Sequence, residues 1–260
     1  NLKNCEKGIE FYNKRAKVLV ENESYIREIF KDLPDDTTKL QDKLKDTMRF
    51  YFGEKVLSSL ESRVTIVEGD LGKPALHLSV EDHAMLVEKI DAIIHCGADV
   101  RHFGAADHFQ NVNIEGTRYL LNLAKQRKGI HFHHVSTIGI PEELAGSQWD
   151  YYLEQGDFDY DVTLESVYNQ SKLEAENIVR DAVKEDIPVS VYRVGNLTCH
   201  SESGKFQQNM DNNAFYRMIK SMLCLAKTPE AKWYIDFTPI NFACQALVAI
   251  ARQPKSNGHV

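Results

Sequence analysis

The chain has 260 residues, a formal net charge of -7 and 43% hydrophobic residues, which is the composition of a globular protein large enough to bury a sizeable core. The negative charge, and the lack of any Lys/Arg-rich tract, argue against a nucleic-acid surface. No apolar run is long enough to cross a bilayer, no signal peptide opens the chain and the five cysteines are scattered, so we expect a cytoplasmic protein with reduced thiols and no membrane partner.

In chain order, a charged helical pattern over residues 1–33 precedes a series of short β-branched runs alternating with helical patterns. The predicted strands are Arg63–Val67, Asp91–His95, Ile130–Val135 and Val189–Val194. The predicted helices between them are Val80–Lys89, Asn113–Gln126 and Glu165–Glu185. Strands that are apolar nearly throughout, joined through helices, predict an α/β fold with a parallel sheet covered on both faces.

Several polar or small residues fall where these strands end, and ligands of such sheets bind outside the carboxyl ends of the strands. Asp70, Gly97 and Thr137 all occupy such positions. Each position also has an interpretation without a ligand, because glycine and aspartate favour tight turns and small residues suit a chain that turns over a sheet. Asn113 is likewise either an N-cap of its helix or a residue of the site.

Tyr168 and Lys172 are four residues apart, and this spacing places both on one face of the third predicted helix. Tyr51 with Lys55 and Tyr216 with Lys220 repeat the interval, so the spacing alone does not identify an active pair. Tyr168 differs in context, because its helix follows a strand that ends in Ser-Thr. A phenol, a nearby ammonium group and a hydroxyl can together protonate a carbonyl oxygen, and we expect the ammonium to lower the pKa of the phenol from about 10.

Two segments resemble metal sites only weakly. Of the histidines in His131–His134, His131 and His133 share a strand face, but no carboxylate or cysteine is placed beside them. The acidic segment Asp157–Asp161 lacks the glycine and terminal glutamate of a calcium loop. We therefore predict no metal.

A resemblance to a known family rests on the order and spacing of several segments across residues 38–260. These segments are Phe50–Gly53, Val67–Leu71, Ile94–Ala98, Asn111–Thr117, His134–Thr137, Tyr168 with Lys172, Arg193–Thr198 and Tyr234–Ile240. Together they resemble the thioester reductase domains that end nonribosomal peptide synthetases, within the extended short-chain dehydrogenase/reductase superfamily. Carboxylic acid reductases and fatty acyl-CoA reductases are close relatives of that group.

The resemblance implies a Rossmann-like fold and a role for each matching residue. Thr137, Tyr168 and Lys172 take the catalytic positions, with Thr137 rather than Ser136 as the hydroxyl, because successive strand residues face opposite ways. Asp70 and Leu71 would contact the adenine of the cofactor, and Gly97 and Ala98 its middle. Gly195, Asn196 and Leu197 would lie near the nicotinamide, while Lys172 would also contact the ribose.

The chain departs from that family at both ends. The family begins with a strand and a glycine-rich loop, which residues 1–37 do not show. We therefore predict a helical segment, residues 1–37, that does not match the family, and a partial NAD(P)-binding core over residues 38–260. We expect the core to be incomplete at its N-terminus and to lack most of the C-terminal substrate region.

By resemblance, the function is NADPH-dependent reductive release of an acyl or peptidyl thioester from a phosphopantetheinyl carrier domain, as an aldehyde or further as an alcohol. NADPH rests on the family, with NADH as the alternative cofactor. Two other hypotheses stay open: a reductase or epimerase of the same fold that acts on a free acyl-CoA or nucleotide sugar, and a non-catalytic scaffold that lost its cofactor. Retention of Thr137, Tyr168 and Lys172 counts against the scaffold.

Overall fold

The computed structural model describes residues 37–61, 63–101, 104–145, 162–210, 213–230 and 236–253 of the chain. Contacts divide the chain into two compact units, residues 1–66 and 67–260. In the first unit, helices α2 (Thr37–Phe52) and α3 (Glu54–Glu61) pack against each other. Gly53 joins them with a φ of 77°, which glycine adopts without steric cost. The helix predicted over residues 1–33 lies outside the described residues.

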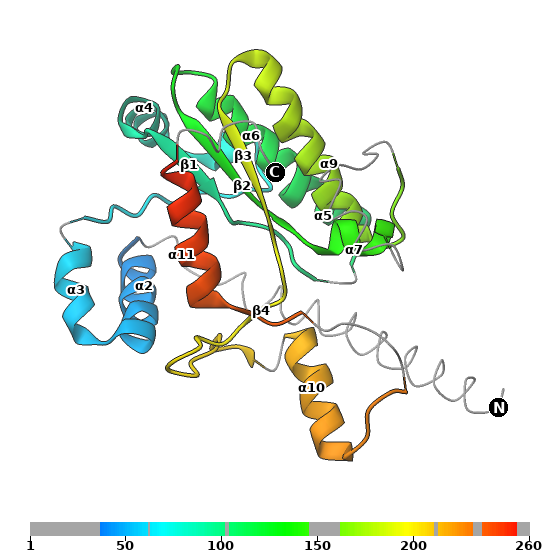
Figure 1. Cartoon of the computed structure of the whole chain (residues 1–260). Coiled ribbons are helices and arrows are strands. Elements are labelled where there is room, and N and C mark those ends of the chain that lie inside the picture. Colours follow the sequence, from blue (N-terminus) through cyan, green and yellow to red (C-terminus); the bar gives the residue numbers. More distant parts are fainter. Residues whose placement is uncertain are drawn as a thin grey trace. The chain divides into compact units, whose positions relative to one another are not determined.

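The second unit is built on a three-stranded parallel sheet with the order β1-β2-β3, and this confirms the predicted α/β class (Figure 1). The strands are β1 (Ala92–His95), β2 (His131–Thr137) and β3 (Val189–Val194), each within two residues of its predicted bounds. His95 pairs with His134, and Thr137 pairs with Val194. All three strands therefore end at one edge of the sheet.

The prediction of a strand at Arg63–Val67 is wrong. Residues 64–70 have no regular secondary structure. Strand β1 is an edge strand of the described sheet and pairs with β2. A β-branched run forms a strand when a neighbouring strand takes its backbone hydrogen bonds, and no described strand does so here. The segment Arg63–Val67 therefore has the composition of a strand, but no described strand lies beside it to accept and donate the backbone hydrogen bonds.

Helices connect the strands. Before β1, the short η1 (Pro74–His77) is followed by α4 (Val80–Lys89), which matches its prediction and begins after Ser79, whose hydroxyl accepts from the Asp82 N–H. The link from β1 to β2 contains α5 (Ala106–Phe109), the π-helix η2 (Gln110–Glu115) and α6 (Gly116–Ala124). Asn113 lies inside this continuous helical stretch, so its interpretation as an N-cap is wrong.

The link from β2 to β3 contains α7 (Gly139–Ala145), α9 (Val167–Asp181) and the short η4 (Ala182–Glu185). Helices α6 and α9 pack on the sheet and on each other. Their contact forms the main hydrophobic core, in which Leu121 and Val179 meet Phe132 and Val191 of the strands. Burying each such side chain contributes about 1.5–3 kcal/mol, which fixes α9 against β2.

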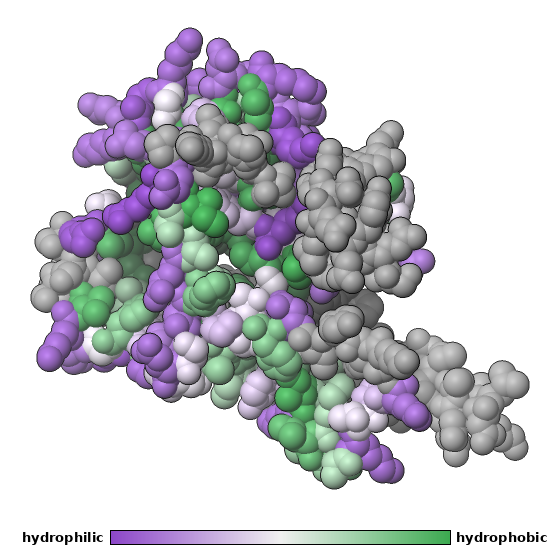
Figure 2. Space-filling view, viewed as in Figure 1, coloured by the Kyte–Doolittle hydropathy of each residue, from purple (hydrophilic) through white to green (hydrophobic). Residues whose placement is uncertain are grey.

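The remaining elements of the second unit follow β3. Strands β4 (Leu197–Thr198) and β5 (Thr238–Pro239) form a two-stranded parallel ladder, with α10 (Ala214–Leu225) between them and α11 (Ile240–Ala251) after them. Figure 2 shows apolar side chains gathered over α10, where Leu223 and Leu225 are exposed. Each helix in the described ranges is too short or too polar to span a bilayer.

Candidate active site

Thr137 and Tyr168 meet at the carboxyl edge of the sheet. Thr137 is the last residue of β2, and Tyr168 is the second residue of α9. Ser166 begins α9 here, because its hydroxyl accepts a hydrogen bond from the Asn169 N–H at 3.2 Å. The side chains of Thr137 and Tyr168 are joined by a hydrogen bond. Two hydroxyls from separate segments therefore lie within hydrogen-bonding reach of each other.

The phenol of Tyr168 is held in its protonated form. Burial raises the pKa of Tyr168 above its ordinary value, and the hydrogen bond from Thr137 opposes this shift without cancelling it. We expected the neighbouring ammonium group to lower this pKa. Burial raises it instead, because removing the phenolate from water is costly, and Thr137 is the group that opposes the shift. A phenol that keeps its proton at neutral pH can serve as a proton donor.

The amine of Lys172 lies one helical turn beyond Tyr168, against the backbone of β2. Its side chain is nearly enclosed, with 3% of the residue exposed. The Nζ donates to the carbonyl of Val135 at 2.7 Å and lies 3.5 Å from His134 Nε2. Burial lowers the pKa of Lys172 to about 8, against the opposing influence of Glu176 and Cys96. The ammonium is therefore lost at a much lower pH than that of an exposed lysine.

A buried ion pair supports this helix from the side of β3. Glu176, which is 0% exposed, accepts hydrogen bonds from the guanidinium of Arg193, the shortest at 2.8 Å. Glu176 follows Lys172 by four residues, on the same face of α9. The carboxylate thus gives Lys172 a favourable electrostatic environment while its own hydrogen bonds go to Arg193.

Asn113 joins the loop after β1 to α9. Its Oδ1 accepts from the Asp99 N–H at 2.7 Å, and its Nδ2 donates to the Asp99 carbonyl and to the Ser171 hydroxyl. Ser171 in turn donates to the carbonyl of Tyr168. One buried amide therefore fixes the Tyr168 backbone relative to the residues that follow Gly97 and Ala98. The sequence offered Asn113 as a candidate but gave no sign of these partners.

The predicted adenine residues lie beside an apolar slot. Asp70 and Leu71 follow the irregular segment after Val67, and the Asp70 carboxylate accepts from the Gly72 N–H at 2.8 Å. Leu71 packs on Gly97 so closely that a Cβ at Gly97 would lie 2.6 Å from Leu71 Cδ1. The structure thus brings Leu71 and the loop of Gly97 and Ala98 together.

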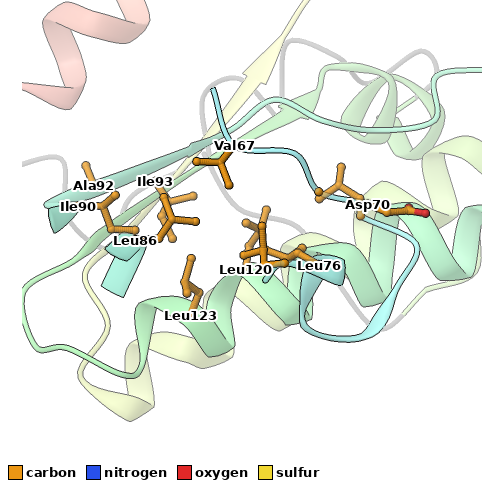
Figure 3. Close-up of a pocket in the computed structure, with 12 residues that line it drawn as sticks. Val67, Asp70, Leu76, Leu86, Ile90, Ala92, Ile93, Leu120 and Leu123 are labelled. Carbon is orange, nitrogen blue, oxygen red and sulfur yellow. The ribbon is translucent and has the colours of Figure 1, made fainter. Parts of the chain in front are cut away.

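The slot itself has a volume of about 370 Å³. Figure 3 shows Leu86, Ile90 and Ile93 at one end and the Asp70 carboxylate at the other. Among the described residues that line it, Asp70 is the charged one. A cavity of this size with one polar end suits a flat, mostly apolar ring.

The segment Gly195–Leu197 follows β3 at the same edge and is held in place by Asp236. The carboxylate of Asp236 accepts from the Asn196 N–H at 2.6 Å. A Cβ at Gly195 would collide with the Asp236 carboxylate, so a larger residue there would have to displace this carboxylate from the Asn196 N–H. The sequence included Asp236 in the resembling segment Tyr234–Ile240 but did not predict this contact, because a carboxylate forty residues away gives no local signal of it. Tyr234 and Ile235 of the resembling segment lie outside the described residues.

The histidines of β2 have partners of other kinds. His131 and His133 stack with ring centroids 4.0 Å apart, His133 hydrogen bonds to the Tyr192 hydroxyl, and His131 to the Ser190 hydroxyl. Burial lowers the pKa of both imidazoles. Within the described ranges, no cluster of three or more His, Cys, Asp or Glu side chains is arranged to hold a metal ion. The acidic segment Asp157–Asp161 lies outside those ranges.

Known proteins similar to this chain include large multidomain synthetases. A family model for NAD-binding proteins, described as male sterility protein, matches residues 19–247. A linear gramicidin synthase of Brevibacillus parabrevis is 30% identical over 209 residues, which is 80% of this chain and 4% of that protein. Glycine betaine reductase ATRR of Emericella nidulans is 29% identical over 75% of this chain and 15% of its own length.

Two solved structures are similar as well. The terminal R domain of the myxalamid PKS-NRPS pathway has a TM-score of 0.72 and 27% identity, and covers 87% of this chain and 56% of its own. A thiolation-reductase di-domain from an archaeal nonribosomal peptide synthetase has a TM-score of 0.71 and 29% identity, over 83% of this chain and 46% of its own. The chain thus spans about half of these structures and a small part of the curated relatives.

Proposed function

The chain belongs to the NAD-binding family described as male sterility protein, and we propose that it reduces a carrier-bound acyl or peptidyl thioester to an aldehyde. The observation that carries this proposal is the hydrogen-bonded pair Thr137 and Tyr168 at the carboxyl edge of the sheet, with Lys172 on the next turn of α9. The names of the similar proteins support it, because they are synthetases, a reductase and reductase domains of synthetases.

The residues present fit a nicotinamide cofactor at three places, two of them along this edge. The apolar slot beside Asp70 and Leu71 suits the adenine ring, and Gly97 and Ala98 present exposed or half-buried backbone at the end of β1. Gly195–Leu197 suits the nicotinamide, since Asp236 already fixes its backbone. When bound, such a cofactor supplies the hydride; we propose NADPH, with NADH as the alternative.

The chain's own residues manage the charge and the proton of this reaction. As the thioester carbon gains hydride, its oxygen becomes negative, and the hydroxyls of Thr137 and Tyr168 stabilise that charge as preorganised donors. Tyr168 then transfers its proton to the oxygen, which gives a thiohemiacetal. When the carbon–sulfur bond breaks, the hydroxyl proton returns to the Tyr168 phenolate and the carbonyl reforms as an aldehyde. The carrier sulfur leaves as a thiolate, which takes a proton from solvent. Tyr168 keeps its proton at neutral pH, so the proton is present to be transferred, while the raised pKa makes the phenol a weaker acid than an exposed tyrosine.

The partner that we propose is a phosphopantetheinyl carrier domain. The similarity to a thiolation-reductase di-domain supports this partner, since the thiolation and reductase domains occur there in one chain. We further propose that residues 38–260 form the reductase core, preceded by a separate helical segment over residues 1–37. The scattered cysteines support a cytoplasmic location.

Replacing the proposed proton donor tests this function. Tyr168→Phe should lower thioester reduction by about 10²–10⁴-fold, because general acid catalysis contributes about that much. Tyr51→Phe and Tyr216→Phe are matched controls, since each removes a phenol that also precedes a lysine by four residues. The measurement is aldehyde formation from a carrier-linked thioester, with its coenzyme A analogue in parallel. Undiminished turnover in Tyr168→Phe would show that another group donates the proton.

A further inference from the structure

A buried imidazole lies against the Lys172 amine, on the strand that ends at Thr137. His134 is 0% exposed, and its Nε2 is 3.5 Å from Lys172 Nζ. Burial, the Lys172 charge and the neighbouring His95 all lower the pKa of His134 well below its ordinary value. The ring is therefore neutral around pH 7, where the ammonium is also present, and a neutral imidazole can accept a hydrogen bond from it.

We propose that His134 is a positioning residue for Lys172: its Nε2 accepts one ammonium hydrogen bond and, with the Val135 carbonyl, holds the amine at the carboxyl edge of β2. This role rests on the proposed function, because Lys172 matters there as the cation beside Tyr168. Of the three N–H groups of the ammonium, two are directed at β2. The third stays available for the reaction site.

The second ring nitrogen shows which tautomer the contact requires. Since the ring is neutral and Nε2 accepts, the proton must reside on Nδ1. Among the described residues, His134 Nδ1 and Ser136 Oγ are the buried side-chain atoms with no hydrogen-bond partner. An unsatisfied buried N–H costs stability, so a merely structural residue at this position would be better served by an apolar side chain of the same size. The contact with Lys172 accounts for a histidine here.

Groups from each neighbouring element act on this amine. His134 faces it from β2, His95 and Cys96 act from β1 and the loop after it, and Glu176 acts from its own helix. Arg193 of β3 neutralises much of the Glu176 charge through their ion pair. The Nε2 of His95 is hydrogen bonded to the Thr117 hydroxyl at 3.0 Å. This bond holds the His95 ring beside that of His134. Among the described residues, the Lys172 amine therefore contacts two neutral groups, the Val135 carbonyl and the His134 ring, while the nearby Glu176 carboxylate is paired with Arg193.

The tautomer of His134 can be observed in the unaltered protein. Long-range ¹H–¹⁵N correlation spectra distinguish a protonated Nδ1 from a protonated Nε2 without any substitution. We expect His134 to carry its proton on Nδ1 over the whole pH range in which the protein is folded. A proton on Nε2 would overturn the proposal, because that nitrogen could no longer accept from Lys172.

Two amide substitutions at His134 separate positioning from packing. His134→Gln places an amide near the Nε2 position and retains an acceptor for Lys172, whereas His134→Asn reaches only the Nδ1 position. In His134→Asn we expect the pKa of Lys172, followed by ¹³C NMR of its ε-carbon, to fall below about 8, because a hydrogen bond to the charged form is lost. His134→Gln should leave this pKa near that of the parent.

Activity should follow the lysine titration. The alkaline limb of kcat/KM should move to lower pH in His134→Asn, with a fall of about tenfold at neutral pH, the effect of losing one hydrogen bond to a charged group. Ser136→Ala removes the other unpartnered group on the same face of β2 and should change neither readout. An unchanged Lys172 titration in His134→Asn would overturn the positioning role.

The two proposals fail separately. The Lys172 titration needs no substrate, so a shift in His134→Asn without thioester reduction by the parent protein would retain the contact and reject the proposed function. Conversely, if Tyr168→Phe loses activity while His134→Asn leaves the pKa of Lys172 unchanged, the proposed function is retained and the positioning role of His134 is rejected. If an amide variant does not fold, the His134 tautomer in the unaltered protein still decides the question.

Discussion

Helices α9 and α11 show opposite relations between composition and burial. Helix α9 contains Lys172 and Glu176, two charged residues that are almost completely buried. Helix α11 is apolar at most of its positions, yet none of its residues is buried, and Phe242 is 66% exposed. The difference lies in what each helix packs against, because α9 is enclosed by β2, β3 and α6, whereas α11 contacts mainly the ends of the strands.

In this fold, buried charge rather than buried apolar surface distinguishes α9, the helix that contains the proposed catalytic residues. Burying an ionised group costs several kcal/mol unless a partner compensates it. Around Lys172 and Glu176 every such cost is met by a specific contact, from Val135, His134 or Arg193. The exposed apolar side chains of α10 and α11 require no comparable arrangement.

The largest expected effect comes from removing the carboxylate of the buried ion pair. Glu176→Gln should lower the free energy of unfolding by about 3–5 kcal/mol, because it removes the charged partner of Arg193 from a mostly buried ion pair. The measurement is urea denaturation at pH 7. The matched control is Lys125→Gln, which breaks an exposed pair with Glu185 and should cost less than about 1 kcal/mol. Equal losses would mean that α9 is as open to solvent as the surface pair.

Substitutions at two leucines should show how much more a buried apolar side chain contributes to stability than an exposed one. Leu173→Ala in α9 should lower the free energy of unfolding by about 2–5 kcal/mol, since the residue is 1% exposed and a cavity would remain. Leu223→Ala in α10 should change it by less than about 0.5 kcal/mol, because that side chain is 76% exposed. Both are measured by urea denaturation. A large loss in Leu223→Ala would show that α10 packs against something in solution.

Acid should destabilise the enclosed region. Burial lowers the pKa of His95 to about 3, whereas the unfolded chain takes up this proton near pH 6.5. The unfolded state therefore binds more protons between these values, so stability is lost as pH falls below about 6.5. Between pH 7 and pH 5, the proton uptake of His95 should lower the free energy of unfolding by about 2 kcal/mol. His95→Gln should lose less stability over this interval than the parent, by urea denaturation at both values; an identical loss would assign the effect to other groups.

Much of the second unit was predictable because its strands and helices follow strong local patterns. The bounds of α4 and β3 match their predictions. The order of strands brings their carboxyl ends to one edge, so residues at those ends gather without further information. Local periodicity was sufficient wherever a residue's position follows from its element.

What the sequence did not reveal depends on contacts between distant segments. Arg63–Val67 has strand propensity but no described strand beside it. Asp236 reaches the backbone of Asn196, and Glu176 is paired with Arg193 of a strand that follows after the helix. The direction of the Tyr168 pKa shift also depends on burial, which no spacing of residues reports. Such features require the tertiary arrangement itself.

The contact between Gly195 and Asp236 bears on how this protein could be diversified in the laboratory. A side chain at position 195 would collide with the Asp236 carboxylate and displace it from the Asn196 N–H, so a saturation library there should favour glycine. Leu197, two positions on, is 37% exposed, so substitutions there should disturb the fold less than those at position 195.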